Sequence, residues 1–76
     1  IASLKIELDK LNISTRSYSL KGGLPSEKYC LSNEGHNWSV YYSERGQRTG
    51  ESVFSSESKA CQYFLNELKN DPTTRV

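Results

Sequence analysis

Few residues in this chain have the types and spacing that catalysis or metal binding requires. His36 is the only histidine, and Cys30 and Cys61 are the only cysteines. Neither cysteine is near His36 in sequence, and a reactive nucleophile needs a base and a third, orienting group. The CxxC, HxxxH and HExxH spacings of zinc sites are absent from the sequence. We therefore expect no catalytic residue, no metal site and no cofactor.

The carboxylates and glycines also give no sign of a catalytic or phosphate-binding site. Glu44 and Glu51 lie near the two ends of the polar segment ERGQRTGE, and nothing in the sequence predicts a raised pKa for either carboxyl group. Gly22 and Gly23 lack the lysine and Ser/Thr context of a phosphate-binding loop and are typical of a turn. The sequence thus predicts a protein that is not an enzyme.

Composition limits the fold and the partners. The chain has 76 residues, a length that forms one domain, here residues 1–76. Ten Lys and Arg against nine Asp and Glu give a net charge of +1, which favours neither nucleic acid nor an anionic membrane. No apolar run approaches the roughly 20 residues that span a bilayer. Two cysteines do not make the disulfide framework of a small secreted protein, so we expect a cytoplasmic location.

An amphipathic helix is predicted at the start of the chain. Leu4, Leu8 and Leu11 recur at spacings of four and three, with charged residues on the other faces. This pattern predicts a helix over residues 3–12. Ser3 is the expected N-cap, and position 12 is an asparagine, which favours a helix stop.

A second helix is predicted near the other end. Ser55 and Ser56, followed by an acidic Glu57, form a helix start, because both the cap and the negative charge complement unpaired amides. The helix should end near Asn70, since a proline follows two residues later. Residues 71–76 are expected to form a frayed tail. The apolar stripe of this helix consists of Ala60, Cys61, Phe64, Leu65 and Leu68.

The residues between the helices alternate as half-buried strands do. A short strand over residues 16–20 ends at a Gly/Pro break at residues 22–26, and the alternation restarts at residues 29–31. A turn at residues 33–35 leads to the strongest β segment, residues 38–43, which is rich in aromatic and β-branched residues. These two segments should form a hairpin.

The strongest β segment has one apolar face and one polar face. Alternation places Trp38, Val40 and Tyr42 on the core face and leaves Tyr41 on the polar face as a single exposed tyrosine. A polar loop over residues 44–50 should then lead to a last short strand.

The order of these elements defines the fold class. With the last strand at residues 51–54, the chain reads as a helix, three or four antiparallel strands and a helix. We expect an α+β fold in which the C-terminal helix packs on one face of an antiparallel sheet.

Three stretches of the chain are similar to a known class of protein. They are YSLKGGLPSEKYCL at residues 18–31, WSVYYSERGQRTG at residues 38–50 and VFSSESKACQYFL at residues 53–65, about half of the chain. With them the chain resembles small immunity proteins of bacterial polymorphic toxin systems, including contact-dependent growth inhibition. In that class a strand ending YYSERG is followed by a phenylalanine strand and a helix with a Ser/Glu-rich cap. Ser55 departs from the pattern, which has an acidic residue there.

The resemblance implies a cytoplasmic, non-enzymatic antitoxin that binds a cognate toxin domain and covers or blocks its active site. It also implies that the gene lies directly downstream of a toxin gene. A second mode of binding is β-augmentation, in which a toxin segment pairs with the exposed final strand. For the partner-binding surface we select residues of the charged turn, because interfaces are enriched in tyrosine and arginine. They are Tyr41, Glu44, Arg45, Gln47 and Arg48.

Binding of RNA is the alternative. The order of helix, three strands and helix is also that of double-stranded RNA-binding domains. Those domains contact phosphates through lysines at the start of the second helix, where this chain has Glu57 and one lysine, Lys59. Arg45 and Arg48 could contribute to a basic and aromatic patch, although flanking glutamates offset much of its field. The sequence therefore predicts a protein partner, with no nucleic acid and no membrane, ahead of RNA.

Overall fold

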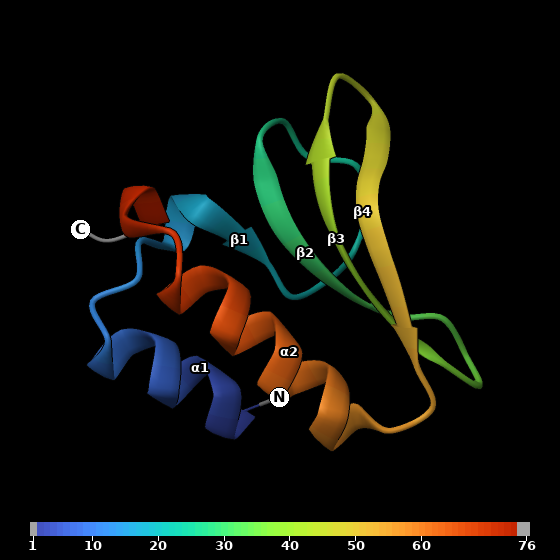
Figure 1. The fold of residues 1–76 in the computed structure, drawn as a ribbon, viewed down its shortest axis with the longest axis horizontal. Helices are drawn as coiled ribbons and strands as arrows, with labels where there is room; N and C mark the ends of the chain where they lie inside the picture. Colours follow the sequence, from blue (N-terminus) through green and yellow to red (C-terminus); the bar gives the residue numbers. More distant parts are fainter. Residues whose placement is uncertain (1, 75–76) are drawn as a thin grey trace.

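A computed structural model describes residues 2–74, which form two helices on one side of a four-stranded sheet (Figure 1). The strands lie in the order β1-β2-β3-β4, and α2 packs on β2, β3 and β4. The predicted α+β fold and the packing of the C-terminal helix on one sheet face are confirmed. The elements are α1 (Ala2–Lys10), β1 (Tyr18–Ser19), β2 (Lys28–Asn33), β3 (Trp38–Glu44), β4 (Gln47–Phe54) and α2 (Glu57–Lys69), with 3-10 turns at Thr15–Ser17 and Pro72–Thr74.

The sheet is mixed, so the prediction of a purely antiparallel sheet is wrong for its first strand. β1 runs parallel to β2 and pairs with it at two positions only, whereas β2, β3 and β4 form an antiparallel meander. Parallel strands need a crossover connection, because the chain must return to the same end of the sheet. Residues 20–27 provide a short one: it runs back beside β2, and Gly22 N–H donates to the Leu31 carbonyl oxygen at 3.2 Å. The Gly22–Gly23 break is therefore part of a crossover and not a simple turn.

The first helix follows the predicted leucine spacing. Leu4 and Leu8 are buried, while Ile6 lies off the stripe and is exposed. Asn12 ends the segment with a φ of 59°, a left-handed conformation that asparagine tolerates better than most residues. Ser3 is not the N-cap, because the helix already includes Ala2 and Ser3 lies within its first turn.

The second helix begins and ends as predicted. The Ser56 side chain accepts a hydrogen bond from Lys59 N–H at 3.4 Å, which satisfies one of the unpaired amides of the first turn. Asn70 forms the C-cap. Ala60, Phe64 and Leu68 are fully buried against the sheet and α1.

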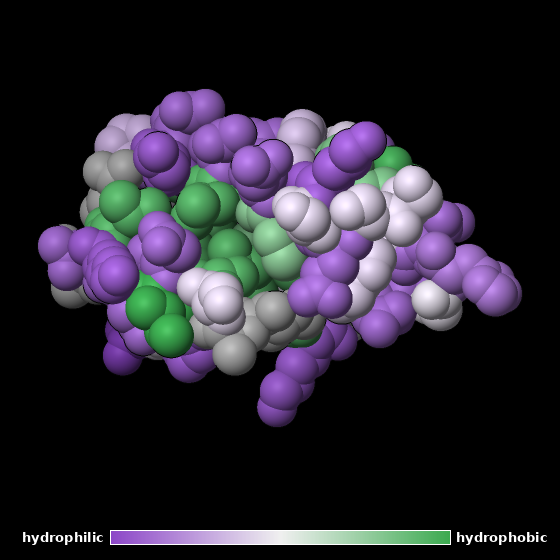
Figure 2. All heavy atoms as spheres, turned by 90° about the horizontal axis from the view of Figure 1, so that it is seen from below, coloured by the Kyte–Doolittle hydropathy of each residue, from purple (hydrophilic) through white to green (hydrophobic). Residues whose placement is uncertain are grey.

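The core lies between the two helices and one face of the sheet. Tyr18 of β1 meets Phe64 of α2 edge to face, with ring centroids 6.3 Å apart. Val40 is buried and Trp38 packs against the same cluster, so the prediction that the Trp38 face is the core face is confirmed. Figure 2, which views the molecule from below Figure 1, shows apolar side chains gathered between polar ones. In the described part of the chain neither helix has the length and apolar character of a membrane span.

The segment after α2 is docked, which corrects the prediction of a frayed tail over residues 71–76. Thr74 is 2% exposed, and its hydroxyl lies 2.8 Å from the carbonyl oxygens of both Leu68 and Asp71. Ser14 N–H donates to the Thr74 carbonyl oxygen at 2.7 Å. These contacts satisfy groups at the end of α2 that the helix itself leaves unpaired. The rest of the predicted tail, residues 75–76, lies outside the described residues.

Candidate functional site

A tight turn joins β3 to β4. Glu44 pairs with Gln47, so the turn has only two central residues, Arg45 and Gly46. Their φ values are 52° and 74°, and two positive values in succession define a type I′ turn. The predicted polar loop over residues 44–50 is therefore wrong, and β4 begins at Gln47. The sequence signal was missed because Asn-Gly and Asp-Gly are the usual type I′ pairs.

β4 contains one extra residue, which forms a β-bulge. Between the pairs Val40–Ser52 and Tyr42–Thr49, β3 advances by two residues while β4 advances by three. Gly50 lies in this stretch with a φ of 61°, which glycine adopts without steric cost. The bulge changes which side chains of β4 share a face, because strand residues on either side of it no longer alternate in register.

Arg48 and Glu51 share the sheet face opposite the helices as a result. In an unbroken strand, residues three positions apart point to opposite faces. Here Arg48 Nη1 lies 2.8 Å from Glu51 Oε2 and 2.7 Å from Glu34 Oε1. Ser32 Oγ donates to Glu34 at 2.9 Å, and Ser39 Oγ donates to Glu51. We call these five residues the Arg48 network.

The Arg48 network balances charge across the sheet face. Hydrogen bonds from Arg48 and then Ser32 hold the pKa of Glu34 below its usual value. For Glu51 the hydrogen bond from Ser39 lowers the pKa most, followed by that from Arg48. Both carboxyl groups therefore stay ionised, and the positive charge of Arg48 is offset by two negative ones.

Tyr41 is buried, so the prediction of an exposed tyrosine at this position is wrong. Its exposed fraction is 1%, although it does lie on the face opposite Trp38 as the alternation predicted. The Arg48 guanidinium covers the ring at 4.1 Å from its centroid. The Tyr41 hydroxyl donates to the Gly23 carbonyl oxygen at 2.7 Å. The crossover of residues 20–27 and the Arg48 side chain together cover the sheet face that carries Tyr41, which the alternation of the sequence predicts to be exposed.

The structure thus separates the five predicted partner-binding residues into two groups. Glu44, Arg45 and Gln47 lie together at the turn, which we call the hairpin tip, and Arg45 and Gln47 are exposed. Tyr41 and Arg48 lie on the sheet face and hold the hairpin in place. Of the five residues, Arg45, Gln47 and Arg48 are exposed, whereas Tyr41 is buried.

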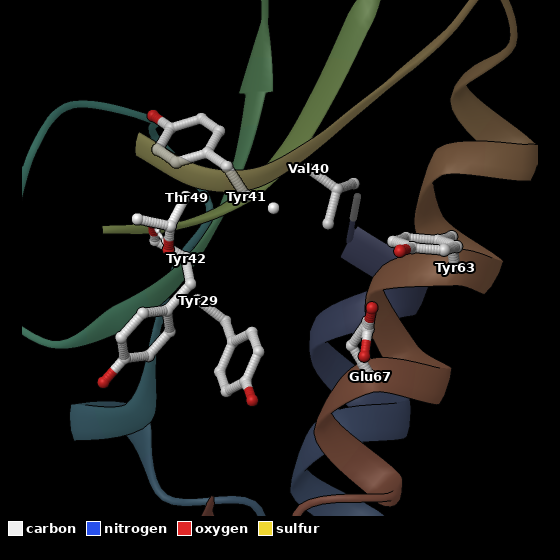
Figure 3. Close-up of a pocket in the computed structure, with 8 residues that line it drawn as sticks. Tyr29, Val40, Tyr41, Tyr42, Thr49, Tyr63 and Glu67 are labelled. Atoms are coloured by element: carbon white, nitrogen blue, oxygen red, sulfur yellow. Dashed lines mark hydrogen bonds between the residues drawn. The ribbon is translucent and has the colours of Figure 1, made fainter. Parts of the chain in front are cut away.

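A hollow of about 240 Å³ opens on the helix side of the same hairpin (Figure 3). Tyr63 and Glu67 reach into it from α2, and Tyr29 and Tyr42 face them from the sheet. The Tyr29 and Tyr42 rings meet edge to face, with centroids 5.0 Å apart. We call this hollow the tyrosine pocket. Its lining residues are Tyr29, Val40, Tyr41, Tyr42, Thr49, Gly50, Tyr63 and Glu67.

Tyr29 links the tyrosine pocket to the end of α2 and gives a test by pH. Its hydroxyl donates to Asp71 Oδ2 at 2.9 Å. Burial, and then the hydrogen bond to Asp71, raise the pKa of Tyr29 from 10.0 to about 12. A raised pKa stabilises the folded state below the unfolded value, and this stabilisation is lost as pH rises from about 10 to about 12.

Tyr29→Phe should therefore lose less stability than the wild type across that alkaline window. Urea unfolding at a series of pH values measures the difference, and Tyr41 and Tyr42, whose pKa values burial also raises, are common to both proteins. Parallel loss of stability in the two proteins would show that ionisation of the Tyr29 hydroxyl is not coupled to folding.

The thiols and the histidine do not come together as a reactive site. Cys30 is fully buried and Cys61 is half-buried, and burial raises the pKa of both thiols, which disfavours the nucleophilic thiolate. His36 lies in the exposed turn between β2 and β3. Among residues 2–74 no group of three or more His, Cys, Asp or Glu side chains is placed to hold a metal ion.

What the described residues do offer is an exposed hairpin tip, an edge strand and a tyrosine pocket, which are built from β2, β3, β4 and α2. A scan against protein-family models, a search of curated proteins and a search of solved structures each found no match to this chain.

Proposed function

We propose that this protein is a bacterial immunity protein that binds and neutralises a cognate toxin domain in the cytoplasm, without catalysis of its own. The observation that carries the proposal is the β3–β4 hairpin, whose exposed tip is held on a braced strand pair at the edge of the sheet. The stretch WSVYYSERGQRTG, which resembles immunity proteins, covers β3, the tip and the first half of β4.

The hairpin tip has the properties of a preorganised contact surface. Arg45 supplies a guanidinium group, Gln47 an amide and Glu44 a carboxylate, and these groups match polar partners on a protein surface. The type I′ turn and the Arg48 network fix the backbone beneath them. A rigid surface loses little conformational freedom on binding, so more of its interaction energy appears as affinity.

The outer edge of β4 offers a second contact that continues from the hairpin tip. β4 pairs with β3, and within residues 2–74 no strand pairs with its other edge. The unpaired backbone groups of such an edge are suited to accept an added strand, the β-augmentation mode. A toxin segment laid along β4 would also reach the hairpin tip.

Arg45→Asn should weaken toxin binding without destabilising the fold. Arginine is often a dominant interface residue, and its loss typically costs about 1–3 kcal/mol, a fall in affinity of about fivefold to 150-fold. Asparagine followed by glycine is a preferred type I′ pair, so the turn itself is retained. Calorimetric titration with the purified toxin domain measures the affinity, and thermal unfolding measures stability.

Arg16→Asn is the matched control, since Arg16 is exposed in the 3-10 turn before β1, away from the hairpin. It should bind like the wild type. Unchanged affinity in Arg45→Asn would remove the hairpin tip from the interface, and absence of any stoichiometric complex with the wild type would contradict the proposed function.

RNA binding is the alternative, favoured by the antiparallel meander β2-β3-β4 between two helices. Against it, Arg48 is held by two carboxylates, and α2 begins with the acidic Glu57. Titration with an RNA duplex of about 16 base pairs distinguishes the two proposals. An affinity for the RNA duplex that falls steeply with salt concentration, as condensed counterions return to the RNA, would favour RNA binding over toxin binding as the function.

A further inference from the structure

The tyrosine pocket presents aromatic rings and a carboxylate to the same small space. Figure 3 shows Tyr63 and Glu67 reaching from α2 toward the sheet, and the Tyr29 and Tyr42 rings on the opposite side. Tyr63 and Glu67 are four residues apart in a helix and therefore lie on one face. The ring of Tyr41 points away, toward the Arg48 guanidinium. Three tyrosine rings and one carboxylate thus define the pocket chemically.

The surroundings of these rings are negatively charged. Tyr29 experiences the charges of Asp71 and Glu67, and Tyr42 experiences those of Glu27 and Glu44. No lysine or arginine is among the residues that line the pocket. Within residues 2–74 no basic side chain forms an ion pair with Glu67. The lining of the pocket therefore carries one carboxylate, that of Glu67, and no basic side chain.

Aromatic rings and a carboxylate around one space attract a cation. The face of a tyrosine ring is the negative end of its quadrupole, and a nearby carboxylate adds a full charge. Guanidinium suits such a site better than ammonium, because it is planar, stacks on rings and is more weakly hydrated. The fit is therefore to a basic group, with arginine ahead of lysine.

The volume limits the occupant to a single side chain. Pockets that enclose whole small molecules measure about 300–1,000 Å³, whereas this hollow measures about 240 Å³. It lies beside Thr49 and Gly50 of β4, directly under the edge where a partner strand would add. Alternate side chains of an added strand point to one face of the sheet, which here is the face that carries the pocket.

We propose that the tyrosine pocket receives an arginine side chain that protrudes from the partner protein, in an inference that rests on the proposed function for the identity of that partner. The guanidinium group stacks against the tyrosine rings and pairs with the Glu67 carboxylate. The β4 edge pairs with the partner backbone, and the tyrosine pocket favours arginine over other side chains of the partner.

The test uses blocked arginine, N-acetyl-arginine methylamide, and the matching citrulline compound, which has the same shape without the charge. Each is titrated at millimolar concentrations into the isotopically labelled protein while amide chemical shifts are followed. We expect arginine to shift the amides of Tyr42, Gly50 and Tyr63, and citrulline to bind about tenfold more weakly. Glu67→Gln should weaken arginine binding about tenfold as well. The matched control is Glu7→Gln, since Glu7 is exposed on α1.

Two results would overturn the inference: no shift at the pocket with arginine, or equal shifts with arginine and citrulline. Because these probes require no toxin, their outcome is independent of whether the proposed function is right. With the toxin domain in hand, Glu67→Gln should weaken the complex about tenfold while Glu7→Gln leaves it unchanged. A complex that is insensitive to Glu67→Gln would show that the partner does not use the pocket.

Discussion

Tyr41→Ala is expected to lower the free energy of unfolding by about 3–5 kcal/mol, the range typical of removing a large aromatic side chain from a packed site. The ring is 1% exposed, with the Arg48 guanidinium on it and the crossover of residues 20–27 beside it. Its removal leaves a cavity between the sheet and the crossover and deprives Arg48 of its aromatic partner. Urea denaturation followed by circular dichroism measures the change.

Tyr41→Phe is the matched variant. It keeps the ring and the contact with Arg48 but loses the hydroxyl that donates to the Gly23 carbonyl oxygen. Loss of one such hydrogen bond typically costs about 0.5–1.5 kcal/mol. A loss below about 1 kcal/mol in Tyr41→Ala is what a surface residue would give, and it would show that the second sheet face is open after all.

Gly22→Ala should be the second strongly destabilising change, by about 2–4 kcal/mol from backbone strain and overpacking together. Gly22 has a φ of 67°, a conformation that alanine adopts only with strain. A Cβ atom at this position would also lie 2.6 Å from Ser32 Oγ. Ser32 cannot retreat freely, because its hydroxyl donates to Glu34 within the Arg48 network.

Gly46→Ala separates strain from overlap in the same denaturation experiment. Its φ of 74° is similar, but in the described part of the chain no atom beyond its two chain neighbours lies within 4 Å of the Cβ position. It should lose only the strain component, about 1–2 kcal/mol. If Gly22→Ala and Gly46→Ala lowered the free energy of unfolding equally, the overlap between residue 22 of the crossover and Ser32 of the sheet would contribute nothing.

The elements that could be predicted from the sequence are those whose signals are local. The second helix has its cap at Ser56 and its buried stripe within one segment, and its bounds follow from them. The β2–β3 hairpin follows from alternation on both sides of residues 33–35. Leucine spacing predicts the first helix, but the expected N-cap at Ser3 is wrong, because the helix already includes Ala2.

The elements that could not be predicted depend on contacts between distant segments. Burial of Tyr41 requires residues 20–27 to lie over the sheet, and alternation within β3 cannot predict this contact with a distant segment. Docking of Thr74 depends on Ser14 and on the end of α2, which no local pattern in residues 71–74 reveals. The bulge at Gly50 shifts side chains of β4 between faces, which strict alternation cannot represent.

The candidate site was predicted in part for the same reason. The hairpin tip follows from a charged turn between two strands, and Arg45 and Gln47 are exposed as a contact surface requires. The tyrosine pocket was missed because it joins Tyr42 of β3 to Tyr63 and Glu67 of α2. The sole sequence signal was a tyrosine and a glutamate four residues apart beside the apolar stripe of α2.

The proposed neutralisation of a toxin is tested most directly by growth of a bacterial host that expresses the C-terminal domain of the protein encoded directly upstream of this gene. We expect the domain alone to arrest growth, co-expression of this protein to restore it, and Arg45→Asn to restore it less well than the control Arg16→Asn. Growth that stays arrested in the presence of the folded wild-type protein would contradict the account.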